Sequence, residues 1–363
     1  MRRRTFVQSA AAAITGLLGG CDGETKSDTK HDKATGVMPE EGQPHQRTWM
    51  AFAVAERIWG PELRPRVQRD LATIATTIGR FEPVSMLVRP GDVAQARELV
   101  GANVELVEAE LDDLWMRDTG PVFVRDGQGR AGVDFNFNGW GGKQEHRSDA
   151  KVAGFVAGRA GVSRTRTDLV LEGGALEVDG EGTAIITESC VLNGNRNRGW
   201  KKSDVEAELA HLLGLRKVIW LPGIAGRDIT DGHTDFYARF AGPGVVVAGL
   251  DNDPASFDYE VTRRHLEILK QATDVHGRPL RIEVMEGPSD TRVRSEDFAS
   301  GYINFYVCNS AVIGPQFGDA KADAAAKATM ERLFPGRTVV QIDIDGIASG
   351  GGGIHCTTQQ EPR

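Results

Sequence analysis

The sequence predicts a mixed α/β fold built from a repeated unit of two strands, one helix and one further strand. Three observations predict it. Short apolar runs typical of strands alternate with amphipathic segments typical of helices along the chain. The order of elements restarts at intervals of roughly 55–70 residues. A polar or ionisable residue stands at the equivalent place of each unit. Units of this kind arranged about one axis form a propeller-like α/β fold without an internal domain boundary.

Each of four units is expected to contain a strand pair, then a helix, then a closing strand. The strand pairs are expected within residues 121–138, 174–188, 234–249 and 302–314. The helices are expected within residues 148–161, 203–214, 257–273 and 321–333. The closing strands are expected at 167–171, 217–221, 281–285 and 338–344. Residues 48–108 supply the remaining strands and helices, so residues 38–363 are expected to form a single domain.

The composition limits the classes of partner. The chain has 363 residues, of which 40% are hydrophobic, and this is enough to bury a large core. The net charge of −8 argues against nucleic acid as a partner and favours a cationic ligand.

The first 37 residues are expected to be separate from the fold. Residues 1–21 combine a basic start, an apolar stretch and small residues, which is the layout of a secretory signal. Arg3 and Arg4 resemble a twin-arginine export signal. Residues 18–21 resemble a bacterial lipobox, which predicts lipidation of Cys21, a membrane anchor and a location outside the cytoplasm. A cleaved soluble signal is the alternative. Residues 22–37 are polar and predict a flexible tether.

The remaining cysteines do not form a metal-binding pattern. Cys190 and Cys308 lie in strand-like apolar runs, where buried structural thiols are expected. No CxxC pair occurs, and the histidines lack metal-ligand spacing, so no metal site is predicted. Cys356 differs, because it follows four consecutive glycines near the end of the chain.

One or two reactive or polar residues stand at the start of each unit. They are Asp118, Glu172, His233 with Asp235, Asn304 and Cys356. Equivalent positions in a symmetric scaffold converge on the axis, so these side chains are expected to form one site.

These residue types favour chemistry on a cationic substrate. A cysteine with a neighbouring histidine suggests a thiolate nucleophile with acid/base assistance. Three buried carboxylates would repel one another and the thiolate unless a cation lay among them. A guanidinium is planar and pairs bidentately with carboxylates, which would leave its central carbon open to sulfur.

Several long motifs resemble one enzyme family. They include "DDLWMRDTGP", "FNFNGWGGK", "LEGGALEVDGEGT", "DGHTDFYARF" and "GGGGIHCTTQQEP". They resemble the agmatine deiminase and bacterial-type peptidylarginine deiminase family, from Val37 to Pro362. The resemblance implies a five-bladed pseudosymmetric α/β propeller, a homodimer as one oligomeric state, and a hydrolase that needs neither metal nor organic cofactor.

The resemblance also implies roles for individual residues. Cys356 matches the nucleophile, His233 the general acid/base, and Glu172 the group that orients the histidine. The residues that match the substrate-binding side chains are Asp118, Asp235 and, by a weaker alignment, Asn304. Trp140 is expected either to line the substrate pocket or only to pack. His355 is expected to point away from the site if the segment is extended.

The implied reaction is hydrolysis of a guanidino compound, most simply agmatine, to N-carbamoylputrescine and ammonia. Two alternatives stay open at this point. One is deimination of peptidylarginine or another alkylguanidine, for which a carboxyl-binding arginine such as Arg57 would be needed. The other is a lipoprotein that binds guanidino ligands without turnover.

Overall fold

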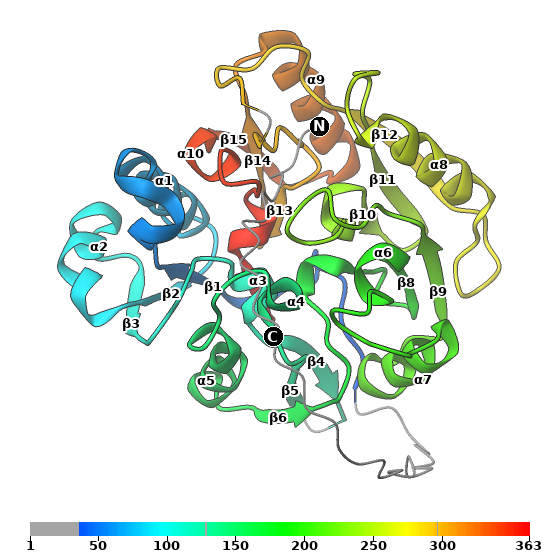
Figure 1. Ribbon diagram of the computed structural model, residues 1–363, viewed down its shortest axis with the longest axis horizontal. Helices are drawn as coiled ribbons and strands as arrows, with labels where there is room; N and C mark the ends of the chain where they lie inside the picture. The colour runs from blue at the N-terminus through cyan, green and yellow to red at the C-terminus, as the bar shows by residue number, and fades with distance from the viewer. Residues whose placement is uncertain (1–35, 128, 296) are drawn as a thin grey trace, which may run out of the picture.

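Five separate small β-sheets form the framework of the protein in the computed structural model, which describes residues 36–127, 129–295 and 297–363. Four sheets have three strands and one has four. Figure 1 shows the sheets distributed around the centre of the molecule, with the longer helices on the outside. The fold is therefore of the predicted mixed α/β class. The predicted signal with Cys21, and residues 22–35 of the predicted tether, lie outside the described residues.

The three-stranded sheets share one connectivity. In the first, β4 (Val122–Asp126) pairs antiparallel with β5 (Gly129–Asp134), and β6 (Ser163–Arg166) returns parallel to β5 after helix α5 (Val152–Ala160). The second has β7 (Leu176–Val178), β8 (Thr183–Thr187), α7 (Lys202–Leu213) and β9 (Lys217–Leu221). The third has β10 (Ala238–Gly242), β11 (Val245–Leu250), α8 (Asp258–Gln271) and β12 (Arg281–Glu286). The fourth has β13 (Tyr306–Cys308), β14 (Ala311–Gln316), α9 (Ala320–Leu333) and β15 (Thr338–Asp343).

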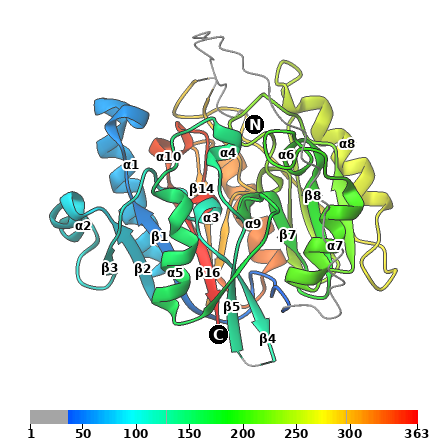
Figure 2. The same cartoon turned by 60° about the horizontal axis from the view of Figure 1, so that its bottom comes forward.

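The fifth sheet joins the two ends of the described chain. Strand β16 (Gln359–Pro362) pairs antiparallel with β1 (His45–Phe52), next to which β2 (Val84–Val88) and β3 (Glu105–Glu108) lie parallel. Helices α1 (Glu56–Ile78) and α2 (Val93–Val100) connect these strands. Figure 2 shows β16 beside β1. The indole of Trp49 in β1 donates to Glu361 in β16 at 2.8 Å, which fixes the segment just after Cys356.

One predicted strand is wrong. Residues 167–171 form a loop, and the closing strand of the first unit is β6, whose sequence SRTR is polar and largely exposed. Leu169 and Leu171 are nevertheless buried, and the Leu171 amide donates to the carbonyl of Phe135 at 3.1 Å. The apolar pattern at residues 167–171 therefore came from a buried loop. The edge strand β6 could not be predicted from its sequence because it has no apolar residues.

Val37, the last residue of the predicted tether, pairs with the domain. Val37 forms an antiparallel bridge with Arg125, with N–O distances of 2.8 and 2.9 Å. Within the described ranges, no helix is long and apolar enough for a membrane crossing.

Candidate active site

The five sequence-predicted positions all precede the first strand of a sheet. Asp118 lies in the short helix α3 (Met116–Thr119) before β4, and Glu172 precedes the 3-10 turn η3 (Gly173–Ala175) before β7. His233 and Asp235 flank the start of η4 (Thr234–Phe236) before β10. Asn304 stands two residues before β13, and Cys356 lies in η5 (His355–Thr357) before β16. Contacts connect these side chains in two groups, Asp118 with His233 and Glu172, and Cys356 with Asn304 and Asp235. Asp118, His233 and Cys356 line one pocket, so the structure brings the two groups together as expected.

A pocket with about 470 Å³ of empty space opens onto this cluster. Cys356, His233, Asp118 and Trp140 line it, together with Trp115, Gln144, Asp228, Ile229, Thr230, Phe236 and Gly350–Gly352. Trp140 therefore lines the pocket, the first of the two expectations for it. The mixture of aromatic walls and carboxylates suits a cation with an apolar chain.

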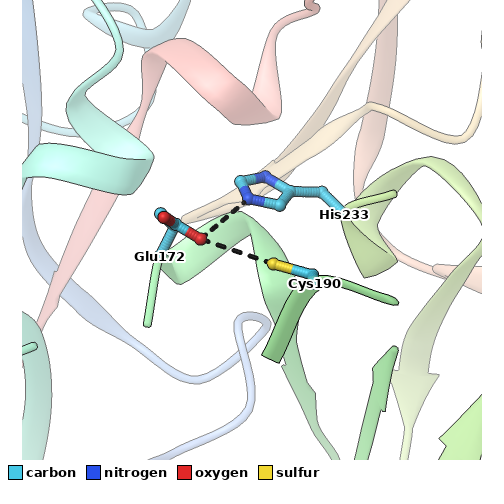
Figure 3. Close-up of side chains that lie close together, drawn as sticks. All are labelled: Glu172, Cys190 and His233. Carbon is cyan, nitrogen blue, oxygen red and sulfur yellow. Dashed lines mark hydrogen bonds and ion pairs between the residues drawn. The ribbon is translucent and has the colours of Figure 1, made fainter. Parts of the chain in front are cut away.

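His233 lies between two carboxylates. Its Nε2 is 3.3 Å from Glu172 Oε2, and its Nδ1 is 3.7 Å from Asp118 Oδ1. Figure 3 draws the contact between His233 and Glu172. Burial opposes protonation, but the Asp118 charge and the hydrogen-bonding groups around the ring outweigh it and raise the pKa of His233 well above its usual value. A protonated imidazole can act as an acid toward a leaving amine.

Glu172 is held as a carboxylate by a buried arginine. Burial favours its neutral form, but Arg196, whose Nε donates to Oε1 at 3.0 Å, lowers the pKa of Glu172 to about 2. Arg196 also donates to Asp231 at 2.5 Å. Glu172 is therefore a fixed anion that can orient His233 over the whole physiological pH range.

Cys356 is buried against Asn304 and Asp235. The Asn304 amide Nδ2 donates to the sulfur at 3.3 Å, and Asp235 Oδ2 lies 3.6 Å from it. Burial, together with the charges of Asp235 and Asp118, raises the pKa of the Cys356 thiol well above its usual value. The thiol therefore stays protonated until positive charge enters the site.

Among the described residues, only one of the two carboxylate oxygens of Asp235 has a hydrogen-bond partner. Its Oδ2 lies 2.8 Å from His355 Nδ1, and although burial opposes ionisation, this contact lowers the pKa of Asp235 to about 2. Its Oδ1 is buried and has no hydrogen-bond partner among the described residues. A buried anionic oxygen without a donor is costly, which indicates a site for a hydrogen-bonding cation.

Asp118 is held by two donors. The Trp140 indole donates to Oδ2 at 3.0 Å and the Gly174 amide to Oδ1 at 3.1 Å. Burial raises the pKa of Asp118 to about 6, with the charges of Asp235 and Glu172 adding to this and His233 opposing it. Trp140 thus positions a carboxylate as well as lining the pocket.

The expectation for the direction of His355 applied to an extended segment, whereas residues 355–357 form a 3-10 turn. His355 bridges Asp235 and Glu41, with its Nε2 2.9 Å from Glu41 Oε2. Glu41 in turn pairs with Arg117 at 3.2 Å and with Arg239 at 2.9 Å. His355 is therefore a positioning residue for Asp235.

Sequence reasoning missed Arg196 and Glu41, which support the site from a loop and from the N-terminal segment. Their charge type was the only signal in the sequence. Arg57, the suggested carboxyl-binding residue, is half exposed and pairs with Asp112 and Glu145 at 3.6 and 3.2 Å. It is absent from the described lining of the pocket.

The glycines before Cys356 are required because the backbone there passes close to other side chains. A Cβ on Gly350 would lie 2.1 Å from the Trp59 ring, and one on Gly352 would lie 2.2 Å from the Trp115 ring. A Cβ on Gly353 would lie 2.4 Å from Asn304 Oδ1. Both tryptophan indoles donate to Asp113, at 2.8 and 3.0 Å, so neither ring can move freely.

Comparisons with known proteins identify the family of this chain. Residues 37–362 match the family described as Porphyromonas-type peptidyl-arginine deiminase. A protein from Pseudomonas aeruginosa named agmatine deiminase is 37% identical over 354 residues, covering 90% of this chain and 95% of the relative. A Streptomyces coelicolor protein, provisionally named an agmatine deiminase, is 47% identical over 343 residues, covering 90% and 98%. The solved structure of the agmatine deiminase of Enterococcus faecalis has a TM-score of 0.85 and 32% identity, covering 90% of this chain and 96% of that one.

Replacing Gly353 with alanine should crowd Asn304 away from Cys356. The substitution Gly353→Ala is expected to lower the free energy of unfolding by about 1–3 kcal/mol, measured by urea denaturation. Gly158→Ala in helix α5 is the control, because no atom lies within 4 Å of its added Cβ. An equal change in the free energy of unfolding for the two variants would contradict the close approach of Gly353 to Asn304.

Proposed function

Because the chain belongs to the Porphyromonas-type peptidyl-arginine deiminase family, we propose that it hydrolyses the guanidinium of agmatine to N-carbamoylputrescine and ammonia. The observation that carries the proposal is the buried, unpartnered Oδ1 of Asp235, whose other oxygen lies 3.6 Å from the sulfur of Cys356. A guanidinium N–H bound at Oδ1 would place the guanidinium carbon within reach of the thiol. Asp118, on the pocket wall, supplies the second carboxylate.

The geometry supports a two-step reaction. Entry of the guanidinium offsets the charges of Asp118 and Asp235, which lowers the pKa of the Cys356 thiol, so that its proton leaves to solvent and the sulfur becomes a thiolate. The sulfur then bonds to the guanidinium carbon, and protonated His233 donates its proton as the C–N bond breaks and ammonia departs. His233 next accepts a proton from water. The resulting hydroxide bonds to the same carbon, the C–S bond breaks, and the hydroxyl proton leaves to solvent, which releases the ureido product and the thiolate.

The pocket lining favours agmatine over arginine. Agmatine ends in an amine, whereas arginine presents a carboxylate there. Among the described residues, the lining includes the acids Asp118 and Asp228 and contains no arginine or lysine. This lining thus favours a dication, and a substrate carboxylate would find no cationic partner in it. The two relatives and the solved structure reported above carry the agmatine deiminase name, which agrees with this choice.

The finer description of the fold is a second part of the proposal. The five sheets are interpreted as the blades of one α/β propeller within a single domain, residues 38–363. The shared connectivity of four sheets, and the position of a site residue before every first strand, support this interpretation. A crystal structure in which the sheets lacked a common axis would contradict it. The homodimer stays a prediction from the family resemblance.

Export and lipidation complete the proposal. The family match begins at residue 37, so the basic and apolar segment with its lipobox precedes the catalytic part. Mass spectrometry of the protein extracted from membranes of its native host tests this. We expect a chain that begins at an acylated Cys21, and a chain that still begins at Met1 would contradict export processing.

Turnover should depend on Cys356 and select agmatine. Ammonia release is to be measured with agmatine, free arginine and an arginyl peptide. We expect turnover of agmatine, and a loss of about four orders of magnitude or more in Cys356→Ser. Cys308→Ser is the matched control, since Cys308 is another buried thiol outside the site. Turnover of the arginyl peptide alone would identify peptidylarginine as the substrate. Tight binding of agmatine without release of ammonia would support a binding protein.

The activity should fall in mild acid because Asp118 becomes neutral. Its pKa is raised to about 6, so it is a carboxylate above this pH and loses its charge below it. The value of kcat/KM for agmatine is expected to fall about tenfold for each pH unit below the pKa. In Asp118→Asn the value should be low throughout, without this acid limb. An unchanged acid limb in the variant would assign the titration to another group.

A further inference from the structure

A second thiol lies next to His233 but takes no part in the proposed reaction. Cys190 Sγ donates to Glu172 Oε2 at 3.4 Å, and the same oxygen lies 3.3 Å from His233 Nε2, as Figure 3 shows. One ligand atom from each of the three residues lies within 4.8 Å of the others, and all three side chains are buried. His233 Nδ1 faces the pocket residue Asp118, so this cluster lies on the other side of the ring.

The donor set and its spacing fit a thiophilic divalent cation. Zinc prefers thiolate, imidazole and carboxylate ligands, with bonds of about 2.3 Å to sulfur and about 2.0–2.2 Å to nitrogen and oxygen. In a tetrahedral site such bonds place neighbouring ligand atoms about 3.3–3.6 Å apart. The distances from Glu172 Oε2 to His233 Nε2, 3.3 Å, and to Cys190 Sγ, 3.4 Å, lie in this range.

The surroundings also resemble the outer contacts of metal sites. Arg196 donates to Oε1 of Glu172 at 3.0 Å and leaves Oε2 facing the cluster, as a ligating carboxylate is usually held. His233 Nδ1 lies 3.7 Å from a carboxylate oxygen of Asp118, which matches the usual partner of a metal-bound imidazole. The positive charge of Arg196 is shared with Asp231 at 2.5 Å, which reduces its repulsion of a cation.

We propose that Glu172, Cys190 and His233 form an inhibitory binding site for Zn²⁺ or a similar thiophilic dication. The metal would bond to the sulfur of Cys190, Oε2 of Glu172 and Nε2 of His233. The thiol proton, and any proton on Nε2, would leave to solvent. The imidazole would keep its proton on Nδ1 and could accept no second one on Nε2, so His233 could not alternate between its protonated and neutral forms as the proposed reaction requires. The inhibition rests on the proposed deiminase function, whereas the binding does not.

The binding is tested with Co²⁺ as a spectroscopic probe in the full-length Cys356→Ser protein. This background removes the competing thiol of the pocket. Thiolate ligation gives a charge-transfer absorption in the near ultraviolet, which should appear on titration and disappear in Cys356→Ser/Cys190→Ser. It should persist in the control Cys356→Ser/Cys308→Ser. Absence of the band, or its survival without Cys190, would overturn the site.

A second variant covers the case in which the Cys190 change prevents folding. Cys356→Ser/His233→Asn keeps the thiol and removes one ligand. Its affinity for Co²⁺ should fall by at least about tenfold, since even outer-contact changes cost about 10–100-fold. An unchanged affinity would overturn the site.

The inhibition is measured as turnover of agmatine over a range of Zn²⁺ concentrations. The concentration for half-inhibition should rise by at least about tenfold in Cys190→Ser, because serine retains a donor to Glu172 but is a poor zinc ligand. Cys308→Ser should behave as wild type. Equal inhibition of wild type and Cys190→Ser would overturn the inhibitory role. If the Co²⁺ band depends on Cys190 but agmatine is not turned over, the metal site stands and only the proposed function is contradicted.

Discussion

The site depends on buried negative charge that the protein compensates only in part. Asp235 and Asp118 are buried next to the thiol of Cys356, and one oxygen of Asp235 lacks a donor among the described residues. Glu172, in contrast, has its own buried arginine, Arg196. In the proposed reaction, a bound guanidinium supplies the positive charge that these carboxylates attract and lowers the pKa of the neighbouring thiol, so substrate binding and activation of the nucleophile occur together.

Rigid packing maintains this unfavourable arrangement. His355, Glu41, Arg117 and Arg239 form a buried charge network that holds Asp235 from behind. Gly350 and Gly352 lie close to the rings of Trp59 and Trp115, and both indoles donate to Asp113. The pairing of β16 with β1 then fixes the chain just beyond the nucleophile. Segments from both ends of the described chain therefore meet at one site, and the cost of burying its carboxylates is distributed over many contacts.

The sequence predicted the site residues better than it predicted their support. Asp118, Glu172, His233, Asp235, Asn304 and Cys356 could be found because each precedes a strand pair in a repeated order. The direction of His355 could not, because nothing in its sequence distinguishes a 3-10 turn from an extended segment. Arg196 reaches Glu172 from a loop that follows no periodic pattern. The cluster with Cys190 was missed for a related reason: its ligands are far apart in sequence and meet only through the fold. Strand β6 was missed because it is a polar edge strand.

The most direct test of the account is to trap the covalent intermediate. The enzyme is to be quenched in acid during turnover of agmatine and digested, and its cysteine peptides are to be weighed by mass spectrometry. The account predicts that the Cys356 peptide gains the mass of agmatine less ammonia, while the Cys190 peptide is unchanged. Turnover accompanied by an adduct on Cys190, or an adduct that forms equally in a protein lacking the Cys356 thiol, would contradict it.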